Sequence, residues 1–271
     1  MGGQHPDSPI LIGGTGGSGT RALYHALTEA GVRFSRHSNS AGDARDFFSF
    51  YDDRINATLN HTRSLNYGID GVPPEVREAS LSELRDTIAR YASTIDVEAG
   101  PWGIKGPRSM YALPYFNLLI PTLRFVHVVR DGRDMALSRN QGQVRRHFEA
   151  LFGHPPEAAP AIAAARLWSK ANVEAADWAE TNLGARYMRL KYEDLCAAPQ
   201  ATLARVFDFL GWSPGELQRA RAASVIRASG TVGRWHSLAE EECAAITAAA
   251  REGLARFGYL ESGKRDVARR G

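Results

Sequence analysis

The chain has 271 residues, of which 44% are hydrophobic and 23% charged, and its formal net charge is +3. This composition is ordinary for a globular protein with a hydrophobic core, and it excludes a fibrous or wholly disordered chain. The charge is too small to indicate nucleic-acid binding, although it suits a small anionic ligand. The sequence predicts one domain over residues 1–262, followed by a basic, disordered tail at residues 263–271.

The ends and the cysteines indicate the cellular compartment. The first residues have no basic segment, and the apolar run after them is too short for a signal peptide or a membrane span. Cys196 and Cys243 are far apart in the sequence, so they form neither a disulfide framework nor a metal site. We therefore expect a cytoplasmic protein with two reduced cysteines.

Predicted strands and helices alternate along the chain. We expect strands at 9–14, 32–35, 123–129 and within 186–195, a loop at 35–46, and helices at 20–31, 81–95, from about 134, at 199–212 and at 239–257. This alternation is typical of an α/β fold, here three-layered and P-loop-like, with a central parallel sheet flanked by helices. Ligands on such sheets bind beyond the carboxyl ends of the strands. Residues 14–21 and 130–138 both follow strands, so we expect them at the same edge.

The stretch "ILIGGTGGSGTRAL", residues 10–23, places a glycine-rich loop between a strand and a helix. Glycine permits positive φ angles and lets backbone N–H groups approach an anion closely. The following helix directs the positive end of its dipole to the same place. We therefore predict an oxyanion site, rather than a plain tight turn, made by Gly16, Gly17, Ser18, Gly19 and Thr20.

This loop departs from the usual nucleoside-triphosphate loop, G-x-x-x-x-G-K-[ST]. Thr20 stands in place of the lysine, and Arg21 stands in place of the hydroxyl that binds magnesium. An ordinary kinase or triphosphate hydrolase would lack its γ-phosphate lysine and its metal ligand. No metal is therefore predicted.

A second candidate loop follows the strand "LRFVHVV". Arg130 stands at the end of the strand, and Ser138 is expected just inside the next helix. An arginine and a serine placed in this way reach the same phosphate. Together the two loops predict a ligand with two separated anionic groups.

Five segments, in this order, resemble the sulfotransferases that use 3′-phosphoadenosine 5′-phosphosulfate (PAPS): "SGT" at 18–20, "WGIKGPRS" at 102–109, the pair Arg130 and Ser138, "KYEDL" at 191–195 and "SGTVGRW" at 229–235. The resemblance implies that Ser18-Gly19-Thr20 binds the 5′-phosphosulfate and that Arg130 and Ser138 bind the 3′-phosphate. It further implies that Lys105 reaches the sulfuryl group and that Tyr192 lies near the adenine. The late element with Gly233, Arg234 and Trp235 would close over the 3′-phosphate.

Three positions depart from that family's pattern. Gly17 replaces a basic loop residue, Pro107 stands where phenol and steroid enzymes carry their histidine base, and Ala228-Ser229 replace an Arg-Lys pair. The chain therefore resembles the bacterial and the carbohydrate- or peptide-type members, which use a carboxylate base.

The implied reaction transfers the sulfuryl group in line to a hydroxyl of a small metabolite or a sugar-containing acceptor and leaves adenosine 3′,5′-bisphosphate (PAP). Negative charge develops on the leaving bridging oxygen, where fixed donors lower the barrier. Lys105 is the first candidate for that role, and Arg21 is the second. Asp43 is the candidate base, with Asp46 and His37 as alternatives.

Several residues have two interpretations. Asp43 would also serve as a helix N-cap. The aromatic run at 47–51 would line an acceptor pocket or form a core helix face. Residues 145–147 would form a solvated face or a lid over an anionic acceptor. His127 is expected to be a core histidine, and Arg133 and Asp134 are expected to tie the second loop by ion pairing.

Two other functions stay open. A nucleotide kinase-like phosphoryl transferase would use Asp131 as an aspartate associated with magnesium. A catalytically degenerate module would bind the nucleotide and transfer nothing. The sequence gives no oligomeric state.

Overall fold

The computed structural model describes residues 8–97, 100–227 and 230–260. Within them a four-stranded sheet, with all neighbouring pairs parallel, has the order β2-β1-β3-β4. The strands are β1 (Ile10–Gly13), β2 (Gly103–Lys105), β3 (Arg124–Val129) and β4 (Tyr187–Lys191). Because β1 and β3 are adjacent and parallel, the loops after them lie at the same edge of the sheet, as predicted.

Helices precede, connect and follow these strands. They are α1 (Thr20–Glu29), α2 (Phe48–Phe50), α3 (Asn56–Thr62), α4 (Pro74–Ala92), α5 (Leu113–Leu119), α6 (Gly132–Ala136), α7 (Gly142–Phe152), α8 (Pro160–Leu183), α9 (Tyr192–Ala197), α10 (Pro199–Leu210), α11 (Glu216–Ser224), α12 (Glu240–Ala249) and α13 (Arg251–Arg256). A π-helical turn at Tyr51–Ile55 joins α2 to α3. No helix in the described parts of the chain is both long and apolar enough to span a bilayer.

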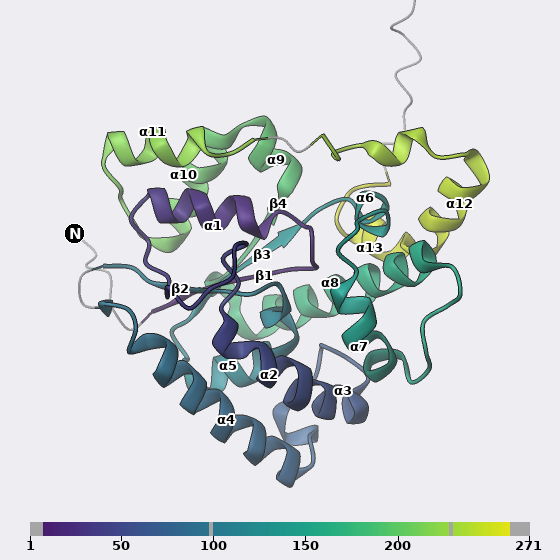
Figure 1. Ribbon diagram of the computed structural model, residues 1–271, viewed down its shortest axis with the longest axis horizontal. Helices are drawn as coiled ribbons and strands as arrows, with labels where there is room; N and C mark the ends of the chain where they lie inside the picture. Colours follow the sequence, from purple (N-terminus) through teal and green to yellow (C-terminus); the bar gives the residue numbers. More distant parts are fainter. Residues whose placement is uncertain (1–7, 98–99, 228–229, 261–271) are drawn as a thin grey trace, which may run out of the picture.

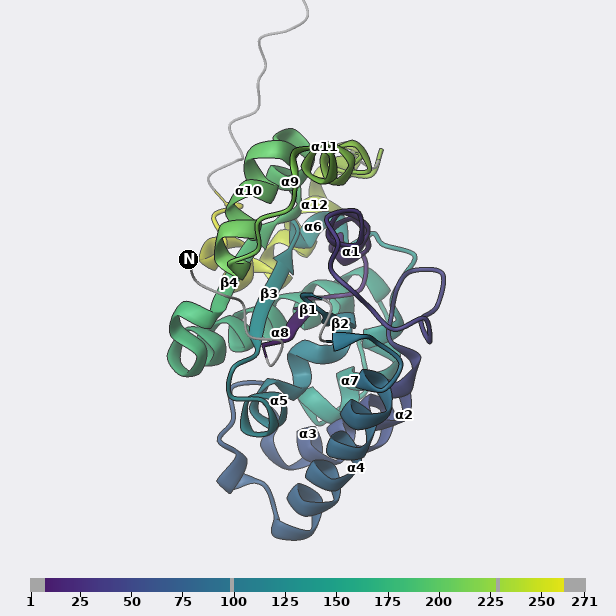
Figure 2. The same ribbon diagram turned by 90° about the vertical axis from the view of Figure 1, so that its left-hand side faces the viewer.

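The sheet lies between two helical layers, which gives the predicted three-layer α/β fold (Figures 1 and 2). Helices α1, α9, α10 and α11 cover one face, and the α2–α5 region covers the other, with α8 beside it. Successive side chains of a strand point to opposite faces. Accordingly, Ile10 and Ile12 of β1 pack toward α1 and α10, whereas Leu11 packs into the opposite core.

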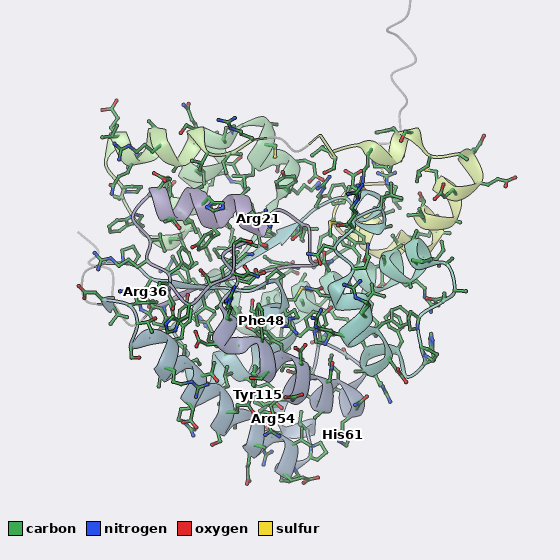
Figure 3. The ribbon with its side chains drawn as sticks, in the orientation of Figure 1. Arg21, Arg36, Phe48, Arg54, His61 and Tyr115 are labelled. Carbon is green, nitrogen blue, oxygen red and sulfur yellow. The ribbon has the colours of Figure 1, made fainter. Side chains whose placement is uncertain are left out.

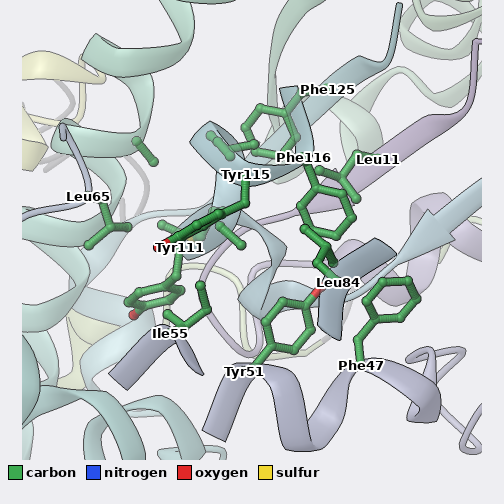
Figure 4. Packing of buried hydrophobic residues seen from close by; sticks show 14 of the residues in the cluster. Leu11, Phe47, Tyr51, Ile55, Leu65, Leu84, Tyr111, Tyr115, Phe116 and Phe125 are labelled. Carbon is green, nitrogen blue, oxygen red and sulfur yellow. The ribbon is translucent and has the colours of Figure 1, made fainter. Parts of the chain in front are cut away.

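The core that contains Leu11, between the sheet and the α2–α5 region, is rich in aromatic residues (Figure 4). Phe47, Phe50 and Tyr51 are fully or almost fully buried there, so the core interpretation of this run holds for Phe47 and Phe50. Tyr51 belongs to this core and also lines a small cavity, as does Phe48. His127 of β3 is also buried, and its ring nitrogens contact the Tyr187 hydroxyl at 3.1 Å and Asn172 Oδ1 at 2.9 Å. The prediction of a core histidine is therefore confirmed.

The expected strand at 32–35 is wrong. Arg33 makes an isolated parallel bridge to Trp102, and the ladder goes no further. The reason is a tertiary contact: the Ser35 amide donates to the hydroxyl of Tyr91 on α4 rather than to a neighbouring strand. The true edge strand, β2, consists of three residues, which is too short for a recognisable period.

Two expected helices also differ. The last helix is divided at Ala250 into α12 and α13, because the Gly253 amide donates to Ser169 Oγ of α8 and a Cβ at Gly253 would lie 2.6 Å from Trp168. Helix α6 begins at Gly132 and ends at Ala136. Ser138 therefore lies in the turn after the helix and not inside it.

Candidate active site

A cavity of about 580 Å³ opens at the carboxyl edge of the sheet. Its walls come from the glycine-rich loop after β1, the end of β2, the turn after α6 and the first residue of α9. The loop at 35–46 and the residues that follow position 229 complete it. This arrangement brings together segments that are up to about two hundred residues apart in the sequence.

Ten of the predicted site residues line this cavity: Gly17, Gly19, Thr20, Arg21, Asp43, Lys105, Arg130, Ser138, Tyr192 and Arg234. Gly16 lines a smaller, adjoining cavity. Ser18 is a fully buried residue of the glycine-rich loop, and its Oγ has no hydrogen-bond partner among the residues described. Gly233 and Trp235 are not part of either lining.

The glycines of the first loop are required by their surroundings. Gly17 and Gly19 have φ angles of 99° and 98°, which side-chain-bearing residues rarely adopt. A Cβ at Gly19 would lie 2.0 Å from the Tyr192 ring, and one at Gly17 would lie 3.0 Å from Ser138 Oγ. The loop therefore lies flat against α9 and against the turn after α6, and α1 begins directly behind it.

The lining of the cavity is strongly cationic. Its positive side chains are Arg21, Lys105, Arg130, Arg139 and Arg234, whereas its carboxylates are those of Asp43 and Asp134. Arg21 stands at the exposed start of α1, above the sheet (Figure 3). This excess of positive charge, next to the N-terminus of α1, gives the cavity a positive potential that favours anions over cations.

Lys105 and Asp43 form an ion pair in the cavity wall. The Lys105 side chain is 2% exposed, and its ammonium group also donates to the Ala41 carbonyl at 3.0 Å. Burial lowers the pKa of Lys105, the Asp43 carboxylate opposes that effect, and the charge of Arg21 adds to it. Lys105, the candidate cation, and Asp43, the candidate base, are therefore electrostatically coupled.

Asp43 does not cap a helix, so the alternative of a helix N-cap is wrong. Ala44 precedes the 3₁₀ turn at Arg45–Phe47 and makes no side-chain cap. The Asp43 carboxylate instead accepts from Asn39 Nδ2 at 3.0 Å as well as from Lys105. Asp46 and His37 lie in the same loop, 3.9 Å apart, and neither lines the cavity.

Arg130 is held by the late element. Its Nη2 donates to the Thr231 carbonyl, to Thr231 Oγ1 at 3.0 Å and to Asp134 Oδ2 at 3.2 Å. Asp134 in turn accepts from the backbone N–H groups of Gly233 at 2.7 Å and Trp235 at 3.2 Å. The Arg234 side chain donates to the Asp134 carbonyl at 2.8 Å. Asp134 thus joins the second loop to the late element.

The expected ion pairing of Arg133 and Asp134 within the second loop is confirmed. Arg133 pairs with Asp131 at 2.6 Å, while Asp134 pairs with Arg130. The Arg133 guanidinium also lies 3.4 Å from the centre of the Trp235 ring. The Asp131 carboxylate is engaged in the ion pair with Arg133, and Asp131 does not line the cavity. It is therefore not placed for the magnesium-associated role that a kinase would require.

Residues 145–147 are divided between the two predicted environments. Arg145 and Arg146 are exposed, whereas His147 is fully buried, so a common solvated face is wrong for the histidine. Burial, together with the charges of Arg108 and Arg146, lowers the pKa of His147 to about 3.

Among the residues of the lining that sequence reasoning missed are Arg139, Asn140 and Thr231. Asn140 lines both cavities, and Thr231 holds Arg130. No pattern in the sequence marks these residues, since each lies in a turn whose position is set by tertiary contacts. The only signal for them in the sequence was that they lie within two residues of the predicted site residues Ser138 and Gly233.

Residues 9–214 match the model of the sulfotransferase family. No curated protein sequence matches the chain. The sulfotransferase domain from the Synechococcus PCC 7002 olefin synthase is 18% identical with a TM-score of 0.56, over 95% of this chain and 96% of that one. Sulfotransferase STF9 from Mycobacterium avium is 12% identical with a TM-score of 0.53, over 96% and 78% of the two chains. STF1 from Mycobacterium tuberculosis H37Rv is 14% identical with a TM-score of 0.51, over 90% and 76%. At these identities the structural similarity concerns the fold.

Proposed function

The chain belongs to the sulfotransferase family, and on this premise we propose that it transfers a sulfuryl group from PAPS to a hydroxyl of a small acceptor. The observation that carries the proposal is the cationic cavity in which the loop after β1, Lys105 and Arg130 converge. The donor supplies the sulfuryl group, and adenosine 3′,5′-bisphosphate is the product. The chain's own residues bind, orient and stabilise charge.

The side chains of the cavity suit a bisphosphorylated nucleotide. Nε of Arg130 and Nε of Arg234 are buried and make no hydrogen bond to any residue that the structure describes. Both arginines line the cavity, on the side of Ser138, so their free N–H groups suit a 3′-phosphate. The backbone of Gly17–Thr20 and the start of α1 suit the 5′-phosphosulfate, and Tyr192 is proposed to lie near the adenine.

Lys105 is proposed to stabilise the leaving oxygen. It is buried, fixed by Ala41 and Asp43, and close enough to Arg21 for that charge to affect its pKa. A fixed cation in a dry site is worth more than a mobile one, because little reorganisation accompanies charge development. Arg21 is exposed, so we assign it to binding the phosphosulfate rather than to the leaving oxygen.

Asp43 is proposed to accept the proton of the acceptor hydroxyl. The acceptor oxygen forms a bond to sulfur, the bond between sulfur and the bridging phosphate oxygen breaks, and the proton passes to the Asp43 carboxylate. Asp43 lines both cavities, so it is exposed to a donor on one side and an acceptor on the other. The positive charge of Lys105 balances the negative charge of the Asp43 carboxylate.

Ligand-induced stabilisation tests the proposed function. Adenosine 3′,5′-bisphosphate without magnesium should raise the melting temperature, because a ligand that binds only the folded state stabilises it. ATP with magnesium is the control for a kinase. Stabilisation by ATP with magnesium, and none by the bisphosphate, would contradict the proposal.

The assignment of the two cations is tested by substitution. Lys105→Ala should lower kcat by about 100-fold or more, which is typical of losing one transition-state donor, and Arg21→Ala should mainly raise the KM for PAPS. Single-turnover rates with labelled donor measure this. A larger loss of kcat in Arg21→Ala than in Lys105→Ala would reverse the assignment.

A further inference from the structure

The smaller cavity, of about 150 Å³, adjoins the larger one at Asp43, Pro107 and Asn140, which line both. Phe48, Tyr51 and Arg108 form part of its wall. Pockets for drug-sized molecules measure roughly 300–1,000 Å³, so this volume suits a compact group. If the proposed function is right, an acceptor in this cavity has its hydroxyl next to Asp43.

The hydroxyl of Tyr51 has no hydrogen-bond partner among the residues that the structure describes. Tyr51 is 2% exposed, and burial raises its pKa, so the hydroxyl is a neutral donor. Figure 4 shows its ring beside Phe47 in the aromatic core. Buried hydroxyls are nearly always paired. Tyr51 lines the smaller cavity, so a hydrogen bond from its hydroxyl to a ligand there would satisfy this donor.

The other buried tyrosines nearby provide a contrast. The Tyr67 hydroxyl donates to the Tyr111 carbonyl at 3.1 Å, Tyr91 donates to the Gly103 carbonyl at 2.8 Å, and Tyr115 is 2.8 Å from Thr58 Oγ1. Each of these hydroxyls is paired within the fold. The unpaired hydroxyl of Tyr51 is therefore not a general property of this aromatic cluster.

Arg108 adds an incompletely neutralised cation to the same wall. Its side chain is 13% exposed and lies 5.2 Å from the centres of the Phe48 and Tyr51 rings. Its Nη1 donates to Asp52 Oδ1, whereas Nε and Nη2 make no hydrogen bond within the described chain. Arg146, which also lines the cavity, pairs with the same Asp52 oxygen at 3.2 Å.

Two guanidinium groups thus share one carboxylate, and among the ion pairs of the described residues one positive charge beside the cavity is left unbalanced. Asp43, the carboxylate that lines the cavity, is already paired with Lys105. His147, which is close to both arginines, is neutral at physiological pH because its pKa is lowered to about 3. A neutral acceptor would leave the charge and the Tyr51 hydroxyl unused, whereas an acceptor with an oxyanion uses both.

We propose that the smaller cavity selects a compact hydroxy acid, a small acceptor that carries both the hydroxyl that is sulfated and a carboxylate. Arg108 and the Tyr51 hydroxyl donate to the carboxylate, Arg146 adds charge at the rim, and Asp43 faces the hydroxyl. This inference rests on the proposed function and specifies its substrate class. Arginine recognises carboxylates through its planar donors, which a lysine does not reproduce.

Matched pairs of acceptors test the inference. The probes are 4-hydroxybenzoate and 3-hydroxybutyrate, their neutral primary amides, and glycerol 3-phosphate as a phosphate-bearing acceptor. With labelled PAPS, each acid should have a kcat/KM at least 30-fold higher than that of its amide and should exceed glycerol 3-phosphate. Equal values for acid and amide, or a preference for the phosphate, would overturn it.

Two variants with matched controls assign the effect. Arg108→Gln should lower kcat/KM for the acids by about 30-fold and change that of the amides less than threefold. Arg145→Gln is the control, because Arg145 is an exposed neighbour of Arg146 outside both linings. Equal losses for acids and amides in Arg108→Gln would indicate a structural role only and would refute the proposed recognition.

Tyr51→Phe removes a hydroxyl that has no partner among the described residues. The melting temperature should not fall, whereas kcat/KM for the acids should fall about tenfold. Tyr115→Phe is the control and should show the reverse, because that hydroxyl is paired with Thr58. A drop in the melting temperature of Tyr51→Phe, with kcat/KM unchanged, would contradict the role assigned to Tyr51.

Calorimetry separates this inference from the proposed function. If adenosine 3′,5′-bisphosphate binds and 4-hydroxybenzoate then binds the complex while its amide does not, both hold, even where turnover is slow. If the bisphosphate binds and neither probe does, or both bind equally, the hydroxy-acid inference alone fails. If the bisphosphate itself does not bind, the proposed function fails, and the inference fails with it.

Discussion

Lys105 is a buried cation whose charge is balanced by a carboxylate 62 residues earlier in the chain. Breaking such a pair leaves an uncompensated charge, which costs more than the pair itself contributes. Lys105 and Asp43 are therefore coupled, and a substitution at either residue alters the other's environment. A conservative amide at position 43 is consequently more informative than alanine.

Asp43→Asn tests the proposed base. The amide retains the shape of the side chain and its hydrogen bond to Lys105 but does not accept a proton, so kcat should fall by about 100-fold to 10,000-fold. Affinity for adenosine 3′,5′-bisphosphate, measured by calorimetry, should change less than threefold.

Asp46→Asn and His37→Gln are the matched controls, because both residues lie in the same loop and neither lines the cavity. Each should retain kcat within threefold. A loss of kcat in Asp46→Asn or His37→Gln as large as that in Asp43→Asn would assign the base differently.

Helix α6 and its flanking turn have few residues but many tertiary contacts. Asp134 of α6 binds the backbone of the late element at Gly233 and Trp235, while Arg130 binds Thr231. The late element is otherwise a 3₁₀ turn at Arg234–Ser237 with no buried residue of its own. Its position beside the cavity therefore depends on these hydrogen bonds and on the contact between Arg133 and the Trp235 ring rather than on hydrophobic burial.

Asp134→Ala should detach the late element from the second loop. We expect a loss of about 3 kcal/mol in the free energy of unfolding, since the Arg130 charge is left unpaired, and a weaker affinity for the bisphosphate, by at least tenfold. Denaturant unfolding and calorimetry measure the two effects.

Asp177→Ala is the control for this prediction. Asp177 is an ion-paired carboxylate on α8 that contacts Arg256 and lies outside the cavity lining. Its replacement should leave the affinity for the bisphosphate unchanged. An Asp134→Ala protein with unaltered affinity would show that the late element does not take part in nucleotide binding.

At the scale of the whole molecule, two histidines of the described residues are neutral because they are buried. Burial lowers the pKa of His127 to about 4 and that of His147 to about 3. An unfolded histidine titrates near 6.5, so the unfolded chain takes up more protons than the folded one below that pH. The contribution of these neutral histidines to the free energy of unfolding is complete above pH 6.5 and decreases as the pH falls toward 4.

The free energy of unfolding should therefore decrease between pH 6.5 and 5, by at most about 1.4 kcal/mol per pH unit for each histidine. Urea unfolding of the native protein and of His147→Gln measures this slope. The variant should have the smaller slope, while both proteins should be insensitive to these groups above pH 7.5. Equal slopes in the acid range would contradict the assignment.

Much of the fold was predictable from local pattern. The buried runs of β1 and β3, the glycine-rich loop and the proline at the start of α10 are signals within a few residues of one another. The strand expected at 32–35 and the uninterrupted last helix failed for a different reason. In both, the hydroxyl of a distant residue, Tyr91 or Ser169, accepts a hydrogen bond from a backbone N–H group of the segment. No local pattern in the sequence reveals such a contact.

The sequence by itself determined the fold class, the family and the two loops that face the cavity, because glycine spacing and strand-end residues are local chemistry. Tertiary structure decided that Lys105 pairs with Asp43 and that Asp134 rather than Asp131 holds Arg130. It also decided that the Tyr51 hydroxyl, close to Arg108, has no partner in the described parts of the chain. The physical reason is that charge balance and hydrogen-bond satisfaction depend on distances between segments far apart in the chain, whereas hydrophobic period and turn chemistry are set by near neighbours.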